Sequence, residues 1–124
     1  MIYLDTQSVL WLYQGDIEKF SPQVRDMLAS EELVISPMVT LELNYLFEIG
    51  KISKQPKSVL LELHEEFGLN VDKIDFAAAL EVAEEERWTR DPFDRIIAAH
   101  AKKNNAVLIT SDRHIRANYK LAMC

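Results

Sequence analysis

The sequence predicts an α/β fold in which helices cover both faces of an open parallel sheet, as in an α/β/α sandwich. Three short apolar runs support this prediction, because they lack the alternating polar residues of a strand with one solvated face. Segments with helical periodicity separate the runs, and such alternation is typical of parallel sheets with right-handed crossovers. The length of 124 residues fits one domain, which we expect to span residues 1–124.

The expected strands are short and lie between segments with helical periodicity. In chain order they are Met1–Leu4, Leu33–Ile35 and Ala106–Ile109, with a weaker candidate at Leu69–Ile74. Runs of this length indicate strands rather than helices, since helices in globular proteins average about 10–14 residues.

Helices are expected between these strands, and capping residues mark several of their starts. Ser21-Pro22, Ser36-Pro37 and Asp91-Pro92 each place a capping side chain directly before a proline that suits a first helical turn. The expected helices span Thr6–Gln14, Pro22–Ala29, Pro37–Ile49, Lys57–Phe67, Phe76–Glu86 and Pro92–Asn104. The acidic run Glu84–Glu86 is expected to be a solvated helix end.

The composition excludes several classes of protein. Fourteen Lys and Arg residues against 20 Asp and Glu residues give a net charge of −6, which disfavours unspecific binding to a polyanion. The single cysteine, Cys124, excludes an internal disulfide and a cysteine-based zinc site. All three glycines follow expected helices, so no glycine-rich phosphate loop is present. Without a basic leader or a long apolar run, we expect a cytoplasmic protein that does not contact membranes.

Two acidic residues follow expected strands. Asp5 ends the first strand, and Asp112 comes directly after Thr110 and Ser111 at the end of the last clear strand. Each aspartate could simply cap the following helix or turn. Because the carboxyl ends of parallel strands lie on the same edge of the sheet, where ligands bind in such folds, a functional role is the second interpretation.

A third acid, Glu42, is expected on the helix that begins near Pro37. A step of about 100° per residue predicts one apolar, core-facing side on this helix. That side comprises Met38, Leu41, Tyr45, Leu46 and Ile49. Glu42 falls within the same arc, where a carboxylate must be paired, protonated or bound to a metal. The alternative is a partly exposed Glu42 that faces solvent or pairs with Lys or Arg.

The segment from Thr89 to Ala99 supplies two more acids. Asp91 suits a helix N-cap, and this structural role explains its position well. Asp94 lies in the first turn, where the helix dipole favours negative charge, but it shares a face with Ile97 and Ala98. Capping therefore explains Asp94 less well, and we favour a functional role for it.

Together, Asp5, Glu42, Asp94 and Asp112 are expected on one edge of the sheet without a matching set of basic residues. Carboxylates that converge in one cleft repel each other, and a divalent cation is the simplest compensation. Ligation by oxygen alone suits Mg²⁺ or Mn²⁺. Such a metal can activate water for attack on a phosphodiester.

Over nearly its whole length the chain resembles the PIN-domain nucleases, in particular the VapC-like toxins of toxin–antitoxin pairs. The segments that carry the resemblance are Asp5-Thr6, Val9–Leu12, Ile35–Pro37 leading to Glu42, Gly50–Ile52, Asp91–Arg95 and Thr110–Asp112. The resemblance implies a metal-dependent endoribonuclease that cuts RNA, a cognate antitoxin that blocks the site, and a homodimer.

The resemblance also implies roles for individual residues. Asp5, Glu42, Asp94 and Asp112 correspond to the family's catalytic acids, and Asp5, Asp94 and Asp112 to its metal ligands. Accessory positions are Asp91, the hydroxyl residues Thr6, Thr110 and Ser111, and Arg95, which could approach a phosphate or pair with a nearby acid. The chain departs from the pattern by ending soon after Asp112, where Tyr119–Cys124 could supply a last short strand.

Two other functions fit the same sequence. One is a housekeeping RNA-processing nuclease, and the other is a catalytically silent α/β module that binds proteins. The presence of all four acids argues against the silent module. The three histidines, His64, His100 and His114, lack partners at ligand spacing and are interpreted as solvated or structural. A late group of basic residues could guide RNA to the site: Lys102, Lys103, Arg113, Arg116 and Lys120.

Overall fold

Five parallel strands form one sheet, in the order β3-β2-β1-β4-β5, in the computed structural model, which describes residues 1–124. The strands are β1 (Ile2–Leu4), β2 (Leu33–Ile35), β3 (Asn70–Val71), β4 (Val107–Ile109) and β5 (Ala122–Met123). The central strand β1 pairs with β2 and β4, so that Tyr3 lies between Val34 and Leu108. All four pairings are parallel, as the apolar runs predicted.

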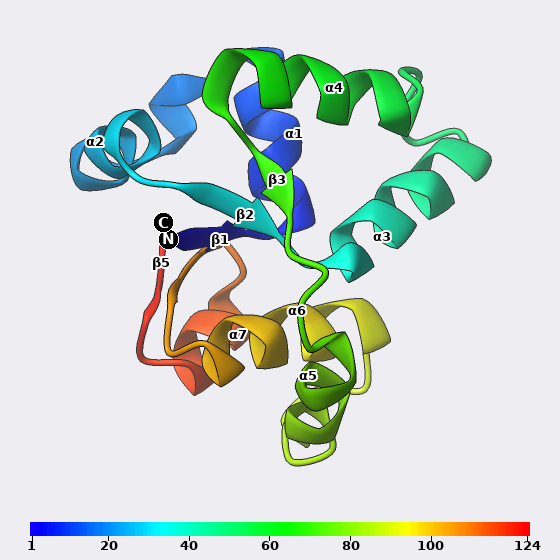
Figure 1. The fold of residues 1–124 in the computed structure, drawn as a ribbon, viewed down its shortest axis with the longest axis vertical. Helices are drawn as coiled ribbons and strands as arrows, with labels where there is room; N and C mark the ends of the chain where they lie inside the picture. The colour runs from blue at the N-terminus through cyan, green and yellow to red at the C-terminus, as the bar shows by residue number, and fades with distance from the viewer.

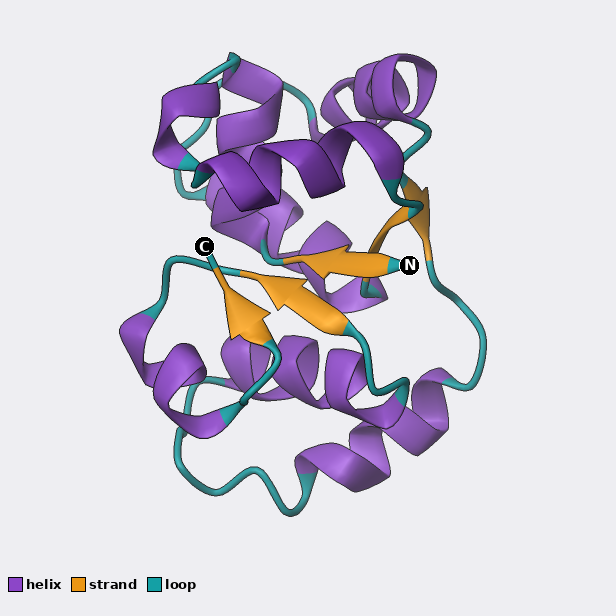
Figure 2. Cartoon of the chain, turned by 90° about the vertical axis from the view of Figure 1, so that its left-hand side faces the viewer, coloured by secondary structure: helices purple, strands orange, loops and turns teal.

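Helices cover both faces of this sheet. They are α1 (Thr6–Gln14), the 3₁₀ turn η1 (Ile17–Lys19), α2 (Pro22–Ser30), α3 (Pro37–Glu48), α4 (Pro56–Phe67), α5 (Phe76–Ala83), α6 (Pro92–Lys103) and α7 (Arg113–Asn118). Figure 1 shows α1, α2 and α4 on one side of the strands and α5, α6 and α7 on the other. Figure 2 shows the strands as a middle layer, which confirms the predicted α/β/α sandwich. None of the helices combines the length and the apolar character that a membrane span requires.

The local signals in the sequence placed most helix boundaries correctly. The hydroxyl oxygens of Ser21 and Ser36 accept hydrogen bonds from first-turn backbone N–H groups of α2 and α3, at 3.3 and 3.2 Å. Gly15 and Gly68 end α1 and α4 in the left-handed conformation, at φ values of 77° and 72°. The sequence did not predict η1 or α7, and β5 occupies part of the expected Tyr119–Cys124 strand.

The predicted core face of α3 was partly wrong, because only Met38 and Leu46 of its five residues pack against the core. Leu41, Tyr45 and Ile49 are exposed, with 56%, 47% and 47% of their surface accessible, whereas Val39 and Leu43 are fully buried. The helical periodicity therefore predicted a core-facing side that is rotated from the observed one, which contains Val39 and Leu43.

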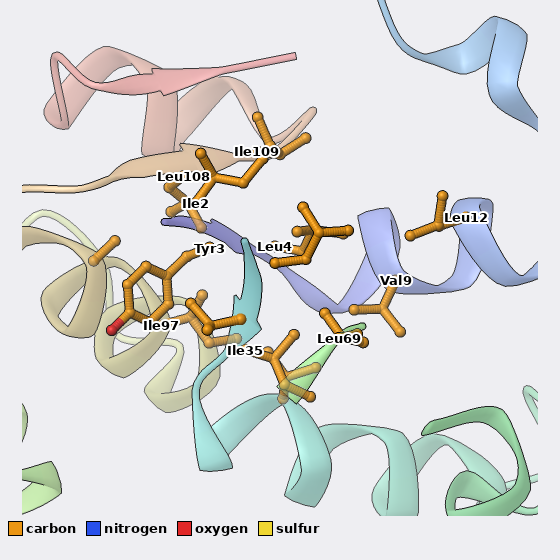
Figure 3. Packing of buried hydrophobic residues seen from close by; sticks show 14 of the residues in the cluster. Ile2, Tyr3, Leu4, Val9, Leu12, Ile35, Leu69, Ile97, Leu108 and Ile109 are labelled. Atoms are coloured by element: carbon orange, nitrogen blue, oxygen red, sulfur yellow. The ribbon is translucent and has the colours of Figure 1, made fainter. Parts of the chain in front are cut away.

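The core is continuous across both faces of β1. Figure 3 shows Leu4 pointing toward the helix that carries Val9 and Leu12, whereas Tyr3 points toward Ile97 of α6. All five side chains belong to one buried cluster and are at most 4% exposed. The strand therefore fixes α1 and α6 on opposite faces of the sheet, and both helices begin near its carboxyl edge.

Glu86 is buried, which corrects the expectation of a solvated helix end. Only 4% of Glu86 is exposed. The indole N–H of Trp88 donates to its carboxylate at 2.6 Å, and the Lys102 ammonium donates to it at 2.7 Å. This ion pair connects the segment after α5 to α6, so Lys102 already has an acidic partner.

A buried polar cluster joins β1, the segment after β3, and α6. The Tyr3 hydroxyl donates to the carboxylate of Asp72, and the side-chain amide of Asn104 donates to the Tyr3 oxygen at 2.7 Å. His100 is fully buried, and its Nε2 lies 3.3 Å from an Asp72 oxygen. Burial lowers the pKa of His100, although the Asp72 charge opposes this shift.

Removing the Tyr3 hydroxyl should destabilise the fold. Tyr3→Phe removes two hydrogen bonds from the cluster, while Asn104 keeps its bond to the His100 carbonyl and Asp72 keeps its bond from the Ile74 N–H. At about 0.5–1.5 kcal/mol for each lost bond, we expect a loss of roughly 1–3 kcal/mol. Urea unfolding of both proteins measures the change in the free energy of unfolding. The matched control is Tyr45→Phe, at an exposed tyrosine, which should change stability by less than about 0.5 kcal/mol. Equal stability of Tyr3→Phe and the wild type would show that the cluster contributes nothing to folding.

Candidate active site

Asp5 lies directly beyond β1 and performs a structural task with one carboxylate oxygen. Its Oδ1 accepts a hydrogen bond from the backbone N–H of Ser8 at 2.8 Å and thereby caps α1. Its own N–H donates to the carbonyl of Ile109 in β4 at 3.1 Å. These two bonds fix the side chain at the carboxyl edge of the sheet.

Asp112 is placed in the same way beyond β4. Its Oδ1 accepts from the backbone N–H groups of His114 and Ile115 at 2.8 and 2.9 Å, which caps α7. Its own N–H donates to the Thr110 hydroxyl at 3.0 Å. Both strand-end aspartates are therefore helix caps and also line the same pocket, so the two interpretations of these residues do not exclude each other.

Glu42 reaches the strand edge from α3. It is half-buried, and the Thr6 hydroxyl donates to its Oε1. No Lys or Arg forms an ion pair with it, which removes the alternative of a paired surface glutamate. Burial raises the pKa of Glu42, the Thr6 hydrogen bond opposes this, and the charges of Asp91 and Asp5 add to it.

Asp91 and Asp94 have the different positions that the sequence predicted. Asp91 is exposed, and its Oδ1 accepts from the N–H groups of Phe93 and Asp94 at 2.8 and 3.1 Å, which confirms it as the N-cap of α6. Asp94 is half-buried and lines the pocket that also contains Asp5.

The four acids share one pocket at the carboxyl edge of the sheet. The pocket has a volume of about 410 Å³ and is lined by Asp5, Thr6, Gln7, Leu10, Glu42, Leu46, Lys51, Asp94, Ser111 and Asp112. We call it the acidic pocket. The structure thus brings together four acids from three helix N-termini and the middle of α3, as well as the predicted hydroxyl neighbours Thr6 and Ser111.

Crowding of negative charge in the acidic pocket is strongest at Asp94. Burial raises the pKa of Asp94 to about 7, with further contributions from the charges of Asp91, Asp112, Glu42 and Asp5. Burial also raises the pKa of Asp5. Hydrogen bonds from Thr110 and Ser8 oppose this shift, and the charge of Asp112 adds to it. None of the four acids is in an ion pair with Lys or Arg.

The donor set of the acidic pocket fits a hard divalent cation. The carboxylates do not form a closed cluster, because no three His, Cys, Asp or Glu side chains are arranged to hold a metal ion. Mg²⁺, however, keeps several waters and needs only one or two direct carboxylates, so a closed cluster is not required. All four acids offer oxygen, and the acidic pocket contains only one cationic side chain, that of Lys51.

Some residues that the resemblance implied lie elsewhere. The Arg95 guanidinium donates to the carbonyls of Ala83 and Glu84 at 2.7 and 3.1 Å, at the end of α5, and does not line the acidic pocket. Thr110 is fully buried and touches the site only through its hydrogen bonds.

The late basic residues do not line the acidic pocket either. Lys102 pairs with Glu86, and Lys103 lies 3.6 Å from Asp75. Sequence reasoning missed Gln7 and Lys51 as pocket residues. Lys51 lies in the Gly50–Ile52 segment of the resemblance, which was the only signal for it.

Solved structures of similar fold are found among VapBC proteins. VapBC2 from Rickettsia felis, solved bound to a DNA fragment from its promoter, gives a TM-score of 0.72 at 24% identity, covering 99% of this chain and 98% of that chain. VapBC-1 from nontypeable Haemophilus influenzae gives a TM-score of 0.66 at 22% identity, covering 99% of this chain and 97% of that chain. PAE2754 from Pyrobaculum aerophilum gives a TM-score of 0.62 at 19% identity, covering 98% of this chain and 87% of that chain. At these identities the similarity shows a shared fold.

The comparison with family models is more direct. The model described as "PIN domain" matches residues 2–121, which include every acid of the acidic pocket. A comparison with curated proteins gave no match. The matched region begins with β1 and ends directly before β5. Because it covers nearly the whole chain and the fold agrees, the chain belongs to the PIN domain family.

Proposed function

We propose that this protein is a metal-dependent endoribonuclease and the toxin of a toxin–antitoxin pair. The observation that carries the proposal is the acidic pocket, where four carboxylates line one space at the carboxyl edge of the sheet without Lys or Arg ion pairs. Binding of the phosphate backbone normally requires positive charge. A pocket of this charge therefore suits a phosphodiester only together with a divalent cation.

Asp5, Asp94 and Asp112 are the residues that would hold Mg²⁺ or Mn²⁺. When bound, the cation supplies stabilisation of the negative charge that develops at the phosphate. The capping bonds of Asp5 and Asp112 fix their carboxylates before any ligand arrives, which limits the reorganisation that binding requires.

Glu42 is the proposed base for the attacking water. Hydrolysis forms a bond from the water oxygen to phosphorus, with the water proton passing to Glu42. It breaks the bond from phosphorus to the leaving nucleotide oxygen, which takes a proton from solvent. Burial raises the pKa of Glu42, and this makes its carboxylate a better proton acceptor. The Thr6 hydroxyl holds Glu42 in position, and Ser111 lies close enough to the same space to orient water.

The proposed partners are an RNA substrate, a cognate antitoxin and a second copy of the chain. The fold that this chain shares with two VapBC structures supports the antitoxin. The exposed apolar side chains of Leu41 and Tyr45 on α3, and of Ile49 directly after it, support a homodimer, because exposed apolar residues at helical spacing often mark interfaces. With RNA as the proposed substrate, the proposed location of the protein is the cytoplasm.

Metal removal tests the nuclease activity. Purified protein should cleave random-sequence single-stranded RNA with Mg²⁺ or Mn²⁺, lose this activity in excess EDTA, and recover it when Mn²⁺ is restored. Cleavage is measured by gel electrophoresis, and a thermal melt in EDTA controls for unfolding. Full activity in EDTA would contradict the proposal.

For the toxin assignment, induced expression of the chain in bacteria should arrest growth, and Glu42→Gln should relieve the arrest.

A further inference from the structure

A second, smaller pocket adjoins the acidic pocket. It has a volume of about 320 Å³ and lies between α1, the connection from α3 to α4, and α4. Its lining residues are Leu10, Tyr13, Gln14, Lys51, Ile52, Ser53, Lys54 and Val59, and we call it the basic groove. Leu10 and Lys51 line both pockets, so the two pockets adjoin each other at these residues. Figure 1 shows α1 and α4 side by side, with the connection from α3 at one end.

The basic groove carries positive charge that no acid of the protein neutralises. Lys51 and Lys54 are both exposed, and neither is in an ion pair. Lys51 also lines the acidic pocket with its four carboxylates, whereas Lys54 lines only the basic groove. A strand whose reacting phosphodiester lies in the acidic pocket would place its neighbouring phosphates near these lysines.

The rest of the basic groove suits a nucleoside. Leu10, Ile52 and Val59 give it an apolar wall, and the ring of Tyr13 adds an aromatic surface on which a base can stack. Gln14 and Ser53 add groups that donate and accept hydrogen bonds. A volume of this size lies at the lower end of the range for pockets that take small organic ligands, about 300–1,000 Å³.

The charge distribution also limits how far a strand can follow the basic groove. Tyr13 also lines a second depression, together with Glu62, Glu65 and Glu66, which adjoins the basic groove on its far side from Lys51. Three carboxylates there would repel a further phosphate, since like charges in proximity disfavour binding. The favourable path therefore runs from the acidic pocket past Lys51 to Lys54 and ends at Tyr13.

We propose that the basic groove binds one nucleotide of single-stranded RNA, adjacent to the phosphodiester that is cut. Lys51 and Lys54 contact the phosphates of this nucleotide, and Tyr13 stacks on its base. These residues are positioning residues, because they hold the strand and do not touch the reacting atoms. The inference rests on the proposed nuclease function and specifies where its substrate lies.

The test compares a double variant in the basic groove with a double variant of equal charge elsewhere. Lys51→Gln/Lys54→Gln removes both groove cations, and Lys19→Gln/Lys73→Gln removes two exposed lysines that line neither pocket. Fluorescence anisotropy measures binding of fluorescein-labelled random-sequence RNA over a range of salt concentrations. For the binding measurements, both double variants also carry Asp94→Asn, so that the RNA is not cleaved.

The groove variant should bind RNA about three- to tenfold more weakly than the control variant at physiological salt. The slope of log Kd against log salt should fall by about 1.4, because single strands lose about 0.7 per phosphate contact. With Asp94 restored, KM should rise by a similar factor and kcat should stay within about twofold, as expected for lost uniform binding.

Tyr13 tests the contact with the base. Tyr13→Phe keeps the ring and should keep the affinity, whereas Tyr13→Leu should weaken binding by about fivefold or more at an unchanged salt slope. Thermal melts establish that each variant is folded. A Tyr13→Leu protein that binds like Tyr13→Phe would overturn the stacking contact.

The outcomes separate this inference from the proposed function. If the wild type cleaves RNA but the groove variant has the affinity and salt slope of the control, the inference is wrong and the nuclease function stands. If the wild type does not cleave RNA but binding still depends on Lys51 and Lys54, the groove assignment stands without the nuclease. A protein partner that co-purifies with the control but not with the groove variant, at equal RNA affinity, would assign the groove to that partner and overturn the inference.

Discussion

Asp94→Asn is expected to lower the rate of RNA cleavage by about 10²-fold or more while leaving the protein folded. Asp94 lines the acidic pocket from the first turn of α6, and it has no capping role, since Asp91 caps this helix. The substitution keeps the shape of the side chain but removes a charge that would hold the cation. Initial rates at saturating Mn²⁺ measure the loss, and circular dichroism monitors the fold.

Asp91→Asn is the matched control, three residues earlier on the same helix. Asn caps helices about as well as Asp, so this variant should keep most of the activity and the melting temperature. Asp91 is exposed and does not line the acidic pocket. An inactive Asp91→Asn protein together with an active Asp94→Asn protein would show that the third acid of the site is Asp91.

Mn²⁺ is expected to raise the melting temperature of the wild type by roughly 10 °C when its concentration is a hundred times Kd. A ligand that binds only the native state stabilises it by about 2.7 kcal/mol under this condition, and a domain of this size shifts by a few degrees per kcal/mol. Relief of repulsion among the acidic-pocket carboxylates is the physical source. Asp94→Asn should show a much smaller rise, and Asp91→Asn a rise close to that of the wild type.

Without metal, Asp94→Asn should melt above the wild type, by a margin that depends on pH. The pKa of Asp94 is about 7 in the folded protein, against an ordinary 3.8. As the pH falls, Asp94 therefore takes up a proton at a higher pH in the folded protein than in the unfolded chain. Stability from this group is therefore lost as pH rises through about 7 and is regained as pH falls toward 4. The advantage of Asp94→Asn should be about 1–2 kcal/mol near pH 8, after allowance for solvent screening, and should shrink near pH 5.

Melting curves in EDTA at these two pH values check this expectation. A wild-type melting temperature that does not respond to Mn²⁺, together with an Asp94→Asn protein that melts lower in EDTA, would show that the acids do not share a metal site.

The positions of strands and helices could be predicted because their signals are local. The expected and observed bounds of α1, Thr6–Gln14, are identical, and β2 is likewise Leu33–Ile35. Apolar runs, capping hydroxyls and glycines act within a few residues of the boundary that they define. The helix α7 has only six residues, too few for a periodic pattern, and the cap at Asp112 was its single signal.

Features that depend on distant partners could not be predicted in this way. Burial of Glu86 depends on Lys102, which lies in the next helix, and the face that α3 buries depends on how the helix leaves β2. In the acidic pocket, the strand ends predicted Asp5 and Asp112 by their position alone. Lys51 enters the pocket from the connection after α3, and no periodicity in the sequence indicates its direction.

The double role of Asp5 and Asp112 has an evolutionary consequence. One oxygen of each carboxylate caps a helix, and an asparagine side chain can supply the same acceptor. A single nucleotide change converts an aspartate codon into an asparagine codon, so activity could be lost in one mutational step without loss of the fold. Such a descendant would still present the surfaces on which the proposed partners bind. In this architecture, inactive paralogues that act by binding are only a short mutational distance from the active protein.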